Sequence, residues 1–390
     1  MTEKYFIKTF GCQQNVADSE RIESFYTSRG FTRADALEEA DVLILNTCVI
    51  RDKAEEKVYG MVKSLRMRLG ESSPRIVVTG CLIGAAAREP SGKMMRRLTT
   101  RLLDVEFLPL EEVGFEYAPQ RAKGKMASIV ISNGCNNFCA FCIVPFSRGK
   151  ERSRPFEEIV TEARQAALAG YEEIVLLGQN VNSYGADFLM EKIKKGEGYI
   201  LPDGTTVQPV MVKHLNRQRI PTLFPILLEQ VALVAGLKKV SFVSSNPWDF
   251  SDELIAVMAR HENIDRTLHL PVQSGDNAIL KRMNRWYTRE EYLALIDRIR
   301  ASVPEVAFTT DVIVGFPGET REQFEASIDL VRRVDFTKTF IAWYSPRPGT
   351  AATRGMEDNI PIEEKQRRFH ELDAIAFKRK KTGKKPLSAD

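Results

Sequence analysis

Three cysteines lie within eight residues near the middle of the chain, and their spacing limits what this segment can become more than any other feature. Cys135, Cys139 and Cys142 form the pattern C-x3-C-x2-C. Three thiolates on one loop are suited to three corners of a 4Fe-4S cube, whose fourth iron then stays open to another ligand. Electron carriers close all four irons with cysteine, so an open iron predicts chemistry at the cluster itself.

Zinc is the alternative ligand for such a group of thiols. Structural zinc sites close four ligands around the ion, often as paired C-x2-C knuckles. No further cysteine follows Cys142, and the next histidine in the sequence is His214. The missing fourth ligand favours an iron-sulfur cluster over zinc.

The N-terminal third predicts a small parallel α/β unit. Three short segments rich in Ile, Val, Leu and Phe have the composition of strands that are buried on both faces of a parallel sheet. Polar-apolar segments between them have helical spacing and end at Gly30 and Gly70. The predicted strands are residues 5–10, 41–45 and 75–78, and the predicted helices are 18–29 and 51–69.

Each of these strands leads into a turn that carries one of the remaining cysteines, Cys12, Cys48 and Cys81. A single free cysteine is more often a small buried apolar residue than a ligand. In open α/β sheets, however, ligands gather beyond the carboxyl ends of the strands, so we expect the three thiols to share one edge. Three thiols at equivalent strand ends favour a second metal-binding set.

Beyond a polar, basic linker around residues 120–125, strand-like and helix-like segments alternate. This alternation predicts a six-stranded parallel partial barrel with its active site at the carboxyl ends of the strands. Polar or glycine-rich segments follow five of the strands, which predicts a large polar ligand in the barrel mouth. The predicted strands are 127–131, 173–177, 239–243, 267–270, 308–314 and 340–344, and the predicted helices include 156–168, 252–260 and two with capping boxes at Thr288 and Thr320.

Composition excludes a membrane-spanning chain. Charged residues make up 28% of the sequence, and no apolar run approaches the ~18 residues of a membrane span. No secretory signal is evident at the start, so we expect a cytoplasmic protein whose thiols stay reduced rather than forming disulfides. The net charge of +4 is mildly basic, and the lysine- and arginine-rich run 378–385 is either a phosphate-seeking tail or, by default, a solvated helix end.

Several segments together resemble a known family. Residues 10–15, 45–57 and 79–81 resemble the N-terminal domain of the methylthiotransferases, and 135–149 resembles their radical S-adenosylmethionine (SAM) core. The resemblance extends over about 4–185 and 222–377. It implies an N-terminal methylthiotransferase domain at 1–120, a radical SAM partial (β/α)6 barrel at 126–355 with an insertion at 186–220, and a C-terminal helix and basic tail at 356–390.

The resemblance also implies the cofactors and the site residues. Cys135, Cys139 and Cys142 would hold the 4Fe-4S cluster that cleaves SAM, while Cys12, Cys48 and Cys81 would hold an auxiliary 4Fe-4S cluster that supplies sulfur. A second SAM would donate the methyl group. By the same analogy the SAM pocket would include Phe141, Gln179, Gln273 and Gly315. Three arginines are candidates for phosphate or methionyl carboxylate contacts, although a surface position is the commoner explanation for each: Arg148, Arg285 and Arg347.

Within the family, segment 51–57 favours the subgroup that modifies carbon 2 of a prenylated adenosine next to the anticodon of tRNA. The implied partners are that tRNA, an electron donor and a sulfur donor. Alternatives are action on threonylcarbamoyladenosine in tRNA or on a ribosomal protein, and, from another class, a non-catalytic iron-sulfur RNA-binding protein. The family's C-terminal RNA-binding β-barrel module is expected to be absent, and the insertion 186–220 is expected to form either a hairpin lid or a disordered loop.

Overall fold

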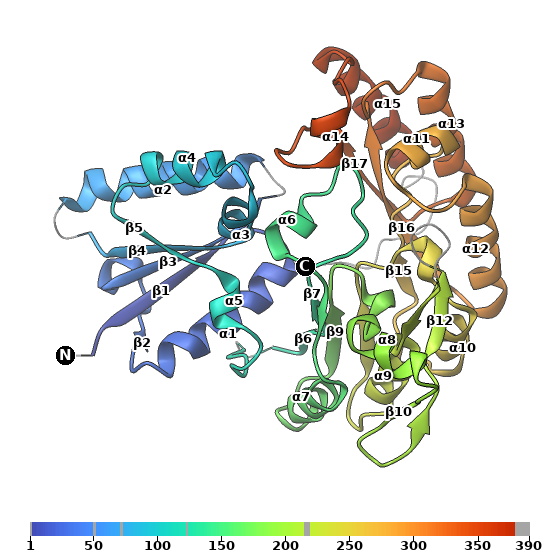
Figure 1. Ribbon diagram of the computed structural model, residues 1–390, viewed down its shortest axis with the longest axis horizontal. Coiled ribbons are helices and arrows are strands. Elements are labelled where there is room, and N and C mark those ends of the chain that lie inside the picture. Colours follow the sequence, from blue (N-terminus) through green and yellow to red (C-terminus); the bar gives the residue numbers. More distant parts are fainter. Residues whose placement is uncertain (1, 50–51, 71–72, 122–123, 214–218, 379–390) are drawn as a thin grey trace.

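The computed structural model describes residues 2–49, 52–70, 73–121, 124–213 and 219–378. It contains an N-terminal unit built on one sheet and a larger unit in which strands and helices alternate (Figure 1). Within these ranges, no helix combines the length and the apolar character needed to cross a membrane. His214, Arg51 and all but the first residue of the basic run 378–385 lie outside the described residues.

The N-terminal sheet has five strands in the order β2-β1-β3-β4-β5, and every pairing in it is parallel. The predicted parallel α/β unit is therefore confirmed. Every residue of the central strand β3 is buried, as the apolar composition predicts. The two edge strands were not among the predicted ones because they are short or partly exposed. The strands are β1 (Lys4–Thr9), β2 (Thr32–Arg33), β3 (Val42–Thr47), β4 (Arg75–Gly80) and β5 (Val105–Leu108).

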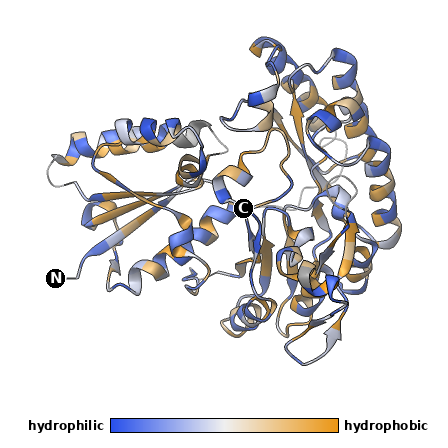
Figure 2. Cartoon of the chain, in the orientation of Figure 1, coloured by the Kyte–Doolittle hydropathy of each residue, from blue (hydrophilic) through white to orange (hydrophobic). Residues whose placement is uncertain are grey.

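Helices cover both faces of this sheet. In Figure 1, α2 and α4 lie on one face and α1 and α5 on the other, and Figure 2 shows the apolar strands enclosed between them. Helix α1 begins five residues earlier than the predicted residue 18, because Cys12 acts as its N-cap and Asn15 completes a capping box. The helices are α1 (Gln13–Thr27), η1 (Leu37–Glu39), α2 (Asp52–Leu69), α3 (Cys81–Arg88), α4 (Lys93–Arg101) and α5 (Leu110–Val113).

The larger unit contains the six predicted barrel strands. They form two three-stranded parallel sheets, ordered β14-β9-β6 and β15-β16-β17. A parallel bridge between Val240 and Ile264 joins the two sheets, so the six strands follow one another in chain order. The partial barrel is confirmed, with strands β6 (Met126–Val130), β9 (Glu173–Leu177), β14 (Lys239–Phe242), β15 (Thr267–His269), β16 (Ala307–Val314) and β17 (Lys338–Trp343).

Helices pack around the outside of these strands (Figure 1). Both predicted capping boxes are present, at Thr288 and Thr320. The predicted helices 156–168 and 252–260 have the observed bounds. The helices of this unit are α6 (Val144–Arg148), α7 (Phe156–Leu168), η3 (Val181–Ser183), α9 (Phe224–Ala232), η5 (Pro247–Asp249), α10 (Asp252–Arg260), α11 (Asn277–Arg282), α12 (Arg289–Ser302), α13 (Arg321–Val334), α14 (Ala351–Gly355) and α15 (Ile362–Lys378), with a small hairpin of β7 (Ser132–Asn133) and β8 (Arg152–Ser153) beside the cysteine loop.

The insertion at 186–220 contains regular structure in its described part. A helix comes first, and two antiparallel hairpins follow. The turn predicted at residues 202–204 closes the first of them. The elements are α8 (Ala186–Lys194), β10 (Tyr199–Ile200), β11 (Thr206–Val207), β12 (Val210–Lys213) and β13 (Arg219–Thr222). The disordered alternative is therefore wrong for these segments.

A buried carboxylate ties the two units together. Glu162 of α7 accepts a hydrogen bond of 2.6 Å from Arg154 and contacts Arg121, and Arg21 of α1 lies 3.9 Å away. The side chain of Glu162 is 9% exposed and that of Arg21 is 4% exposed. Burial raises the pKa of Glu162, but Arg154, Arg121 and Arg21 outweigh burial, so the pKa lies below its ordinary value.

Replacing this carboxylate should destabilise the protein strongly. Glu162→Gln leaves several buried guanidinium groups without their counter-charge, which typically costs about 3–5 kcal/mol. Chemical denaturation would measure the loss. The matched control is Glu172→Gln, which breaks a surface pair with Lys238 and should cost at most about 1 kcal/mol.

The pH dependence of stability gives a second test, in which the wild type is compared with Glu162→Gln. Because the folded-state pKa of Glu162 is lowered, its contribution is present above the unfolded pKa of about 4.3 and is lost as the pH falls through the folded value. The stability difference between the wild type and Glu162→Gln should therefore shrink in acid. A difference that stayed constant into strongly acidic solution would contradict this account.

Candidate metal centres at the domain boundary

The three N-terminal cysteines lie at one edge of the first sheet. Cys12 follows β1 and caps α1, Cys48 follows β3 directly, and Cys81 begins α3 straight after β4. These three strands are neighbours in the sheet. Burial raises the pKa of Cys81, Arg148 lowers it, and Cys48 and Cys12 are among the charges that raise it. Cys12 and Cys48 are thus both close enough to Cys81 to affect it electrostatically.

A glycine brings two of these strand ends together. Gly80 has φ +93°, and a Cβ at this position would clash with the backbone of Thr47. Thr47 and Gly80 directly precede Cys48 and Cys81, so only glycine allows the two cysteine-bearing backbones to approach this closely.

Asn15 is a site residue that the sequence reasoning did not single out. It is fully buried, and its Nδ2 donates to Asn46 and to the carbonyl of Thr47, both at 3.2 Å. The same nitrogen lies 4.0 Å from the Cys81 Sγ, and the Cys12 Sγ lies 3.5 Å from Asn15 Oδ1. The signal in the sequence was a polar residue three positions after a cysteine at the start of a helix.

The second group of thiols lies on the loop between β7 and α6. Cys135 is buried, and burial raises its pKa well above the ordinary value, with Glu151, Cys142 and Cys139 raising it further. Burial and Cys139 raise the pKa of Cys142 to about 12, although Arg285 opposes them. These three thiols therefore also share one electrostatic environment.

The chemistry of the two cysteine sets is that of iron-sulfur ligands. All six cysteines are free thiols. In the described ranges, no three His, Cys, Asp or Glu side chains converge closely enough to hold one metal ion. A cube places its thiolates on separate irons and therefore accepts a wider spacing than a zinc ion. Thiolates are the ligands that such clusters take, so both donor sets suit the group.

Buried polar atoms without partners follow three of the barrel strands and also occur on the second cysteine loop. Ser132, Asn180 and Ser245 follow β6, β9 and β14, and each has a buried oxygen with no hydrogen-bond partner in the described structure. Both side-chain polar atoms of Asn137 are also buried without a hydrogen-bond partner in the described structure. Buried polar groups are normally satisfied, so these atoms mark a place for a polar ligand.

The four residues predicted for the SAM pocket occupy different settings. Gln179 accepts a hydrogen bond of 2.6 Å from the Gly134 N–H, directly beside Cys135. Phe141 packs on the small apolar cluster around Ala140, and Gln273 is 9% exposed with φ +70°. Gly315 is predicted to allow a ligand to approach the backbone closely. In the structure, a Cβ on Gly315 would meet the side chain of Lys365.

Two of the three candidate arginines are buried, so the expected surface position is wrong for them. Arg285 lies 3.5 Å from the Cys139 Sγ and 2.9 Å from Asn246, and its guanidinium stacks 4.5 Å from the Trp248 ring centroid. Arg148 lies at the boundary between the two cysteine sets. Arg347 is only partly buried. A buried arginine needs partners that lie far away in the sequence, which sequence spacing does not reveal.

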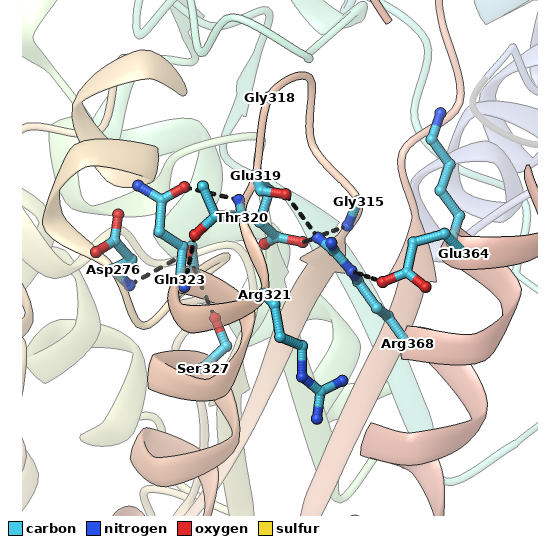
Figure 3. A network of polar contacts seen from close by, with 12 residues as sticks. Asp276, Gly315, Gly318, Glu319, Thr320, Arg321, Gln323, Ser327, Glu364 and Arg368 are labelled. Carbon is cyan, nitrogen blue, oxygen red and sulfur yellow. Dashed lines mark hydrogen bonds and ion pairs between the residues drawn. The ribbon is translucent and has the colours of Figure 1, made fainter. Parts of the chain in front are cut away.

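The loop that carries Gly315 is held by the C-terminal helix. Figure 3 shows the carboxylate of Glu319 between the backbone N–H of Gly315, at 2.7 Å, and the guanidinium of Arg368, at 2.8 Å. Glu319 is 4% exposed and Arg368 is 5% exposed. Glu364, one turn earlier on α15, accepts from Arg368 Nε at 2.6 Å. A charge-assisted network therefore fixes this loop at the carboxyl end of β16.

Comparisons with known proteins agree with this geometry. Residues 129–331 match the model of the radical SAM superfamily, and residues 4–97 match the uncharacterized protein family UPF0004. The radical SAM methyltransferase TsrM from Kitasatospora setae has a similar fold, with a TM-score of 0.55 at 15% identity, over 90% of this chain and 77% of that chain. Since the superfamily model spans just over half of the chain, this is a radical SAM protein.

Curated relatives show which family within the radical SAM superfamily the chain belongs to. A protein named tRNA-2-methylthio-N(6)-dimethylallyladenosine synthase from Thermotoga petrophila is 41% identical, over 95% of this chain and 80% of the relative. The protein of that name from Caldicellulosiruptor saccharolyticus is 39% identical, over 96% and 79%. The chain belongs to the family of tRNA-2-methylthio-N(6)-dimethylallyladenosine synthases, which are radical SAM methylthiotransferases with 4Fe-4S clusters and SAM as cofactors.

If the Gly315 loop lines the SAM pocket, as the family resemblance implies, removing Arg368, which holds this loop through Glu319, should weaken SAM binding. Arg368→Met takes away a charge-assisted contact of about 1.5–3 kcal/mol, so the affinity for SAM should fall about tenfold or more. Equilibrium binding of radiolabelled SAM to the reconstituted protein would measure it. The control is Arg367→Met, because this exposed neighbour pairs with Glu364 and Glu371 of its own helix. Equal affinity in the two variants would refute the role of Arg368.

Proposed function

We propose that this protein methylthiolates carbon 2 of N(6)-dimethylallyladenosine next to the anticodon of tRNA. The observation that carries the proposal is the presence of two separate thiol triads on either side of one helix contact. Cys81 begins α3 and Cys142 lies two residues before the start of α6, and a Cβ on Gly84 of α3 would overlap the Ser147 carbonyl of α6. The names of the curated relatives support the substrate.

The ligand sets divide between the two units. Cys135, Cys139 and Cys142 hold the cluster at which SAM binds, in a core that runs from 126 to 355. Cys12, Cys48 and Cys81 hold the auxiliary cluster in the domain 1–120. The remainder, 356–390, supplies the helix that braces the Gly315 loop. Each set leaves one iron without a cysteine, which is where a further ligand binds.

The target bond explains why the reaction needs a radical. Carbon 2 of adenine carries an unactivated C–H bond, and no side-chain base removes that proton at neutral pH. When bound, the open-iron cluster supplies the electron that cleaves SAM and so opens a radical route to this bond. No side chain of the chain is therefore assigned as an acid or a base.

The protein's own residues position the reactants. Gln179 orients the backbone at Gly134 beside Cys135, and the unpartnered oxygens of Ser132, Asn180 and Ser245 offer hydrogen bonds to the polar parts of SAM. Arg285 places a positive charge at Cys139. With tRNA as its substrate, the enzyme also needs an electron donor and a sulfur donor as partners.

Nucleoside analysis tests the substrate directly. The anaerobically reconstituted protein would be incubated with SAM, dithionite, sulfide and tRNA that carries either prenylated or threonylcarbamoylated adenosine. Mass spectrometry of the digested tRNA should show the 2-methylthio derivative of the prenylated nucleoside alone. A product only on the threonylcarbamoylated tRNA, or none on either, would overturn the assignment.

Iron analysis tests the division between the two triads. The wild type should hold ~8 Fe per chain, as two cubes of four. Replacing Cys12, Cys48 and Cys81 by Ala should halve the iron, retain cleavage of SAM to deoxyadenosine and abolish methylthiolation. The matched variant, with Cys135, Cys139 and Cys142 replaced by Ala, should also lose half the iron but should not cleave SAM. If the first variant lost SAM cleavage, the division of labour would be wrong.

A further inference from the structure

Arg148 is a buried cation that contacts both units at once. It ends α6, the short helix that follows the second cysteine loop. Its Nη2 donates to Asp18 of α1 at 2.6 Å, and its Nη1 donates to Asn133 at 3.1 Å. The side chain of Arg148 is 3% exposed and that of Asp18 is 12% exposed. The core therefore sends a fixed positive charge into the N-terminal domain.

Contacts on the neighbouring helices place that charge near the N-terminal thiols. Asp18, the partner of Arg148, lies one turn beyond Asn15 on α1, and Asn15 Nδ2 lies 4.0 Å from the Cys81 Sγ. Ser147, the residue before Arg148, contacts Gly84, one turn beyond Cys81 on α3. Burial lowers the pKa of Arg148, but Asp18, Cys81 and Cys12 outweigh burial and raise it. Arg148 and Asp18 therefore place two opposite, largely buried charges beside a triad that belongs to the other domain.

Backbone contacts fix the distance between this arginine and the triad. A Cβ on Gly84 would overlap the carbonyl oxygen of Ser147, the residue before Arg148. Arg88 donates 3.1 Å hydrogen bonds both to that oxygen and to the carbonyl of Gly84. Helix α3, which begins at Cys81, is therefore locked against the helix that carries Arg148. The guanidinium position does not depend on a flexible loop.

We propose that Arg148 sets the reduction potential of the cluster on Cys12, Cys48 and Cys81, and that Asp18 is its opposing charge. The inference rests on the proposed role of these cysteines. Net charge and burial are two of the quantities that set cluster potentials. A cation in a site of low dielectric constant stabilises the more negative, reduced cluster, whereas a carboxylate beside it does the reverse. The N-terminal cluster therefore has this reduction potential only when the core is docked against its domain.

Variants with opposite charge changes separate this role from simple docking. Arg148→Met and Asp18→Asn both break the same ion pair, but the first removes a positive charge and the second a negative one. The potential should fall in Arg148→Met and rise in Asp18→Asn, while Arg148→Lys should stay near the parent. A purely structural ion pair would move the first two in the same direction or not at all.

The measurement uses the full chain with Cys135, Cys139 and Cys142 replaced by Ala, so that one cluster remains. After anaerobic reconstitution, dithionite would deliver one electron per cluster, and electron paramagnetic resonance would follow the reduced species against potential. Opposite shifts with unchanged iron content support the proposal. Shifts of one sign, or none, with the iron intact overturn it.

Two further outcomes are also decisive. If Arg148→Met fails to assemble iron, Asp18→Asn decides alone: a higher potential supports the proposal, and an unchanged or lower one overturns it. If the parent with only Cys12, Cys48 and Cys81 holds no iron, the ligand assignment itself is wrong, and the inference falls with it. This last result differs from an intact cluster whose potential does not respond to Arg148.

Discussion

The contact between α3 and α6 is the constraint on which the rest of the site depends. Each helix adjoins one of the cysteine sets, since α3 starts at Cys81 and α6 starts just after Cys142. The two helices meet where Gly84 has no side chain, so the spacing between the two sets is determined by backbone against backbone. Backbone contacts of this kind have no rotamers to change, and the two centres are therefore held in one geometry.

The charges at the boundary make this docking specific. Arg148 forms an ion pair with Asp18, and Glu162 forms ion pairs with arginines of both units. Burying a charge is costly unless it is paired, so these ion pairs add little to the net stability of the interface. They do disfavour any other arrangement of the two units, because it would leave a buried charge unpaired. A shift of the domains would separate a guanidinium from its carboxylate in an environment with little water. The charges thus select one docking, while apolar packing within each unit provides most of the stability.

If the two triads hold clusters as proposed, the same burial affects how the thiols take up metal. Burial raises the pKa values of Cys81, Cys135 and Cys142, so without metal these thiols keep their protons at neutral pH. Cluster ligands must be thiolates, so assembly releases protons and depends on pH. Arg148 and Arg285 oppose the effect of burial, each at a different triad. Both cysteine sites therefore combine buried thiols with one buried arginine that favours the charged form.

The sequence by itself determined the architecture and the six cysteines as candidate ligands. Strand composition predicts parallel sheets, and parallel sheets bring their carboxyl ends to one edge, so Cys12, Cys48 and Cys81 were expected to meet although they lie far apart in the chain. Capping boxes and the C-x3-C-x2-C loop are local signals, and local spacing is what a sequence displays directly. In the insertion, the turn at residues 202–204 and a hairpin as one of two alternatives were predicted. Helix α8 and the second hairpin were not, and the strands of that hairpin are only four residues long.

Only the tertiary structure decided which side chains surround those cysteines. Arg148 and Arg285 look like ordinary surface arginines in the sequence, yet each whole residue is only 6% exposed. Arg285 contacts the Cys139 thiol, and Arg148 pairs with Asp18 of the other unit. Asn15 lies between two of the N-terminal thiols, and Arg368 supports the Gly315 loop from a helix about fifty residues further along the chain. Contacts between residues so far apart depend on how the two units dock, and docking is set by the complementary shapes and charges of whole surfaces rather than by any local pattern.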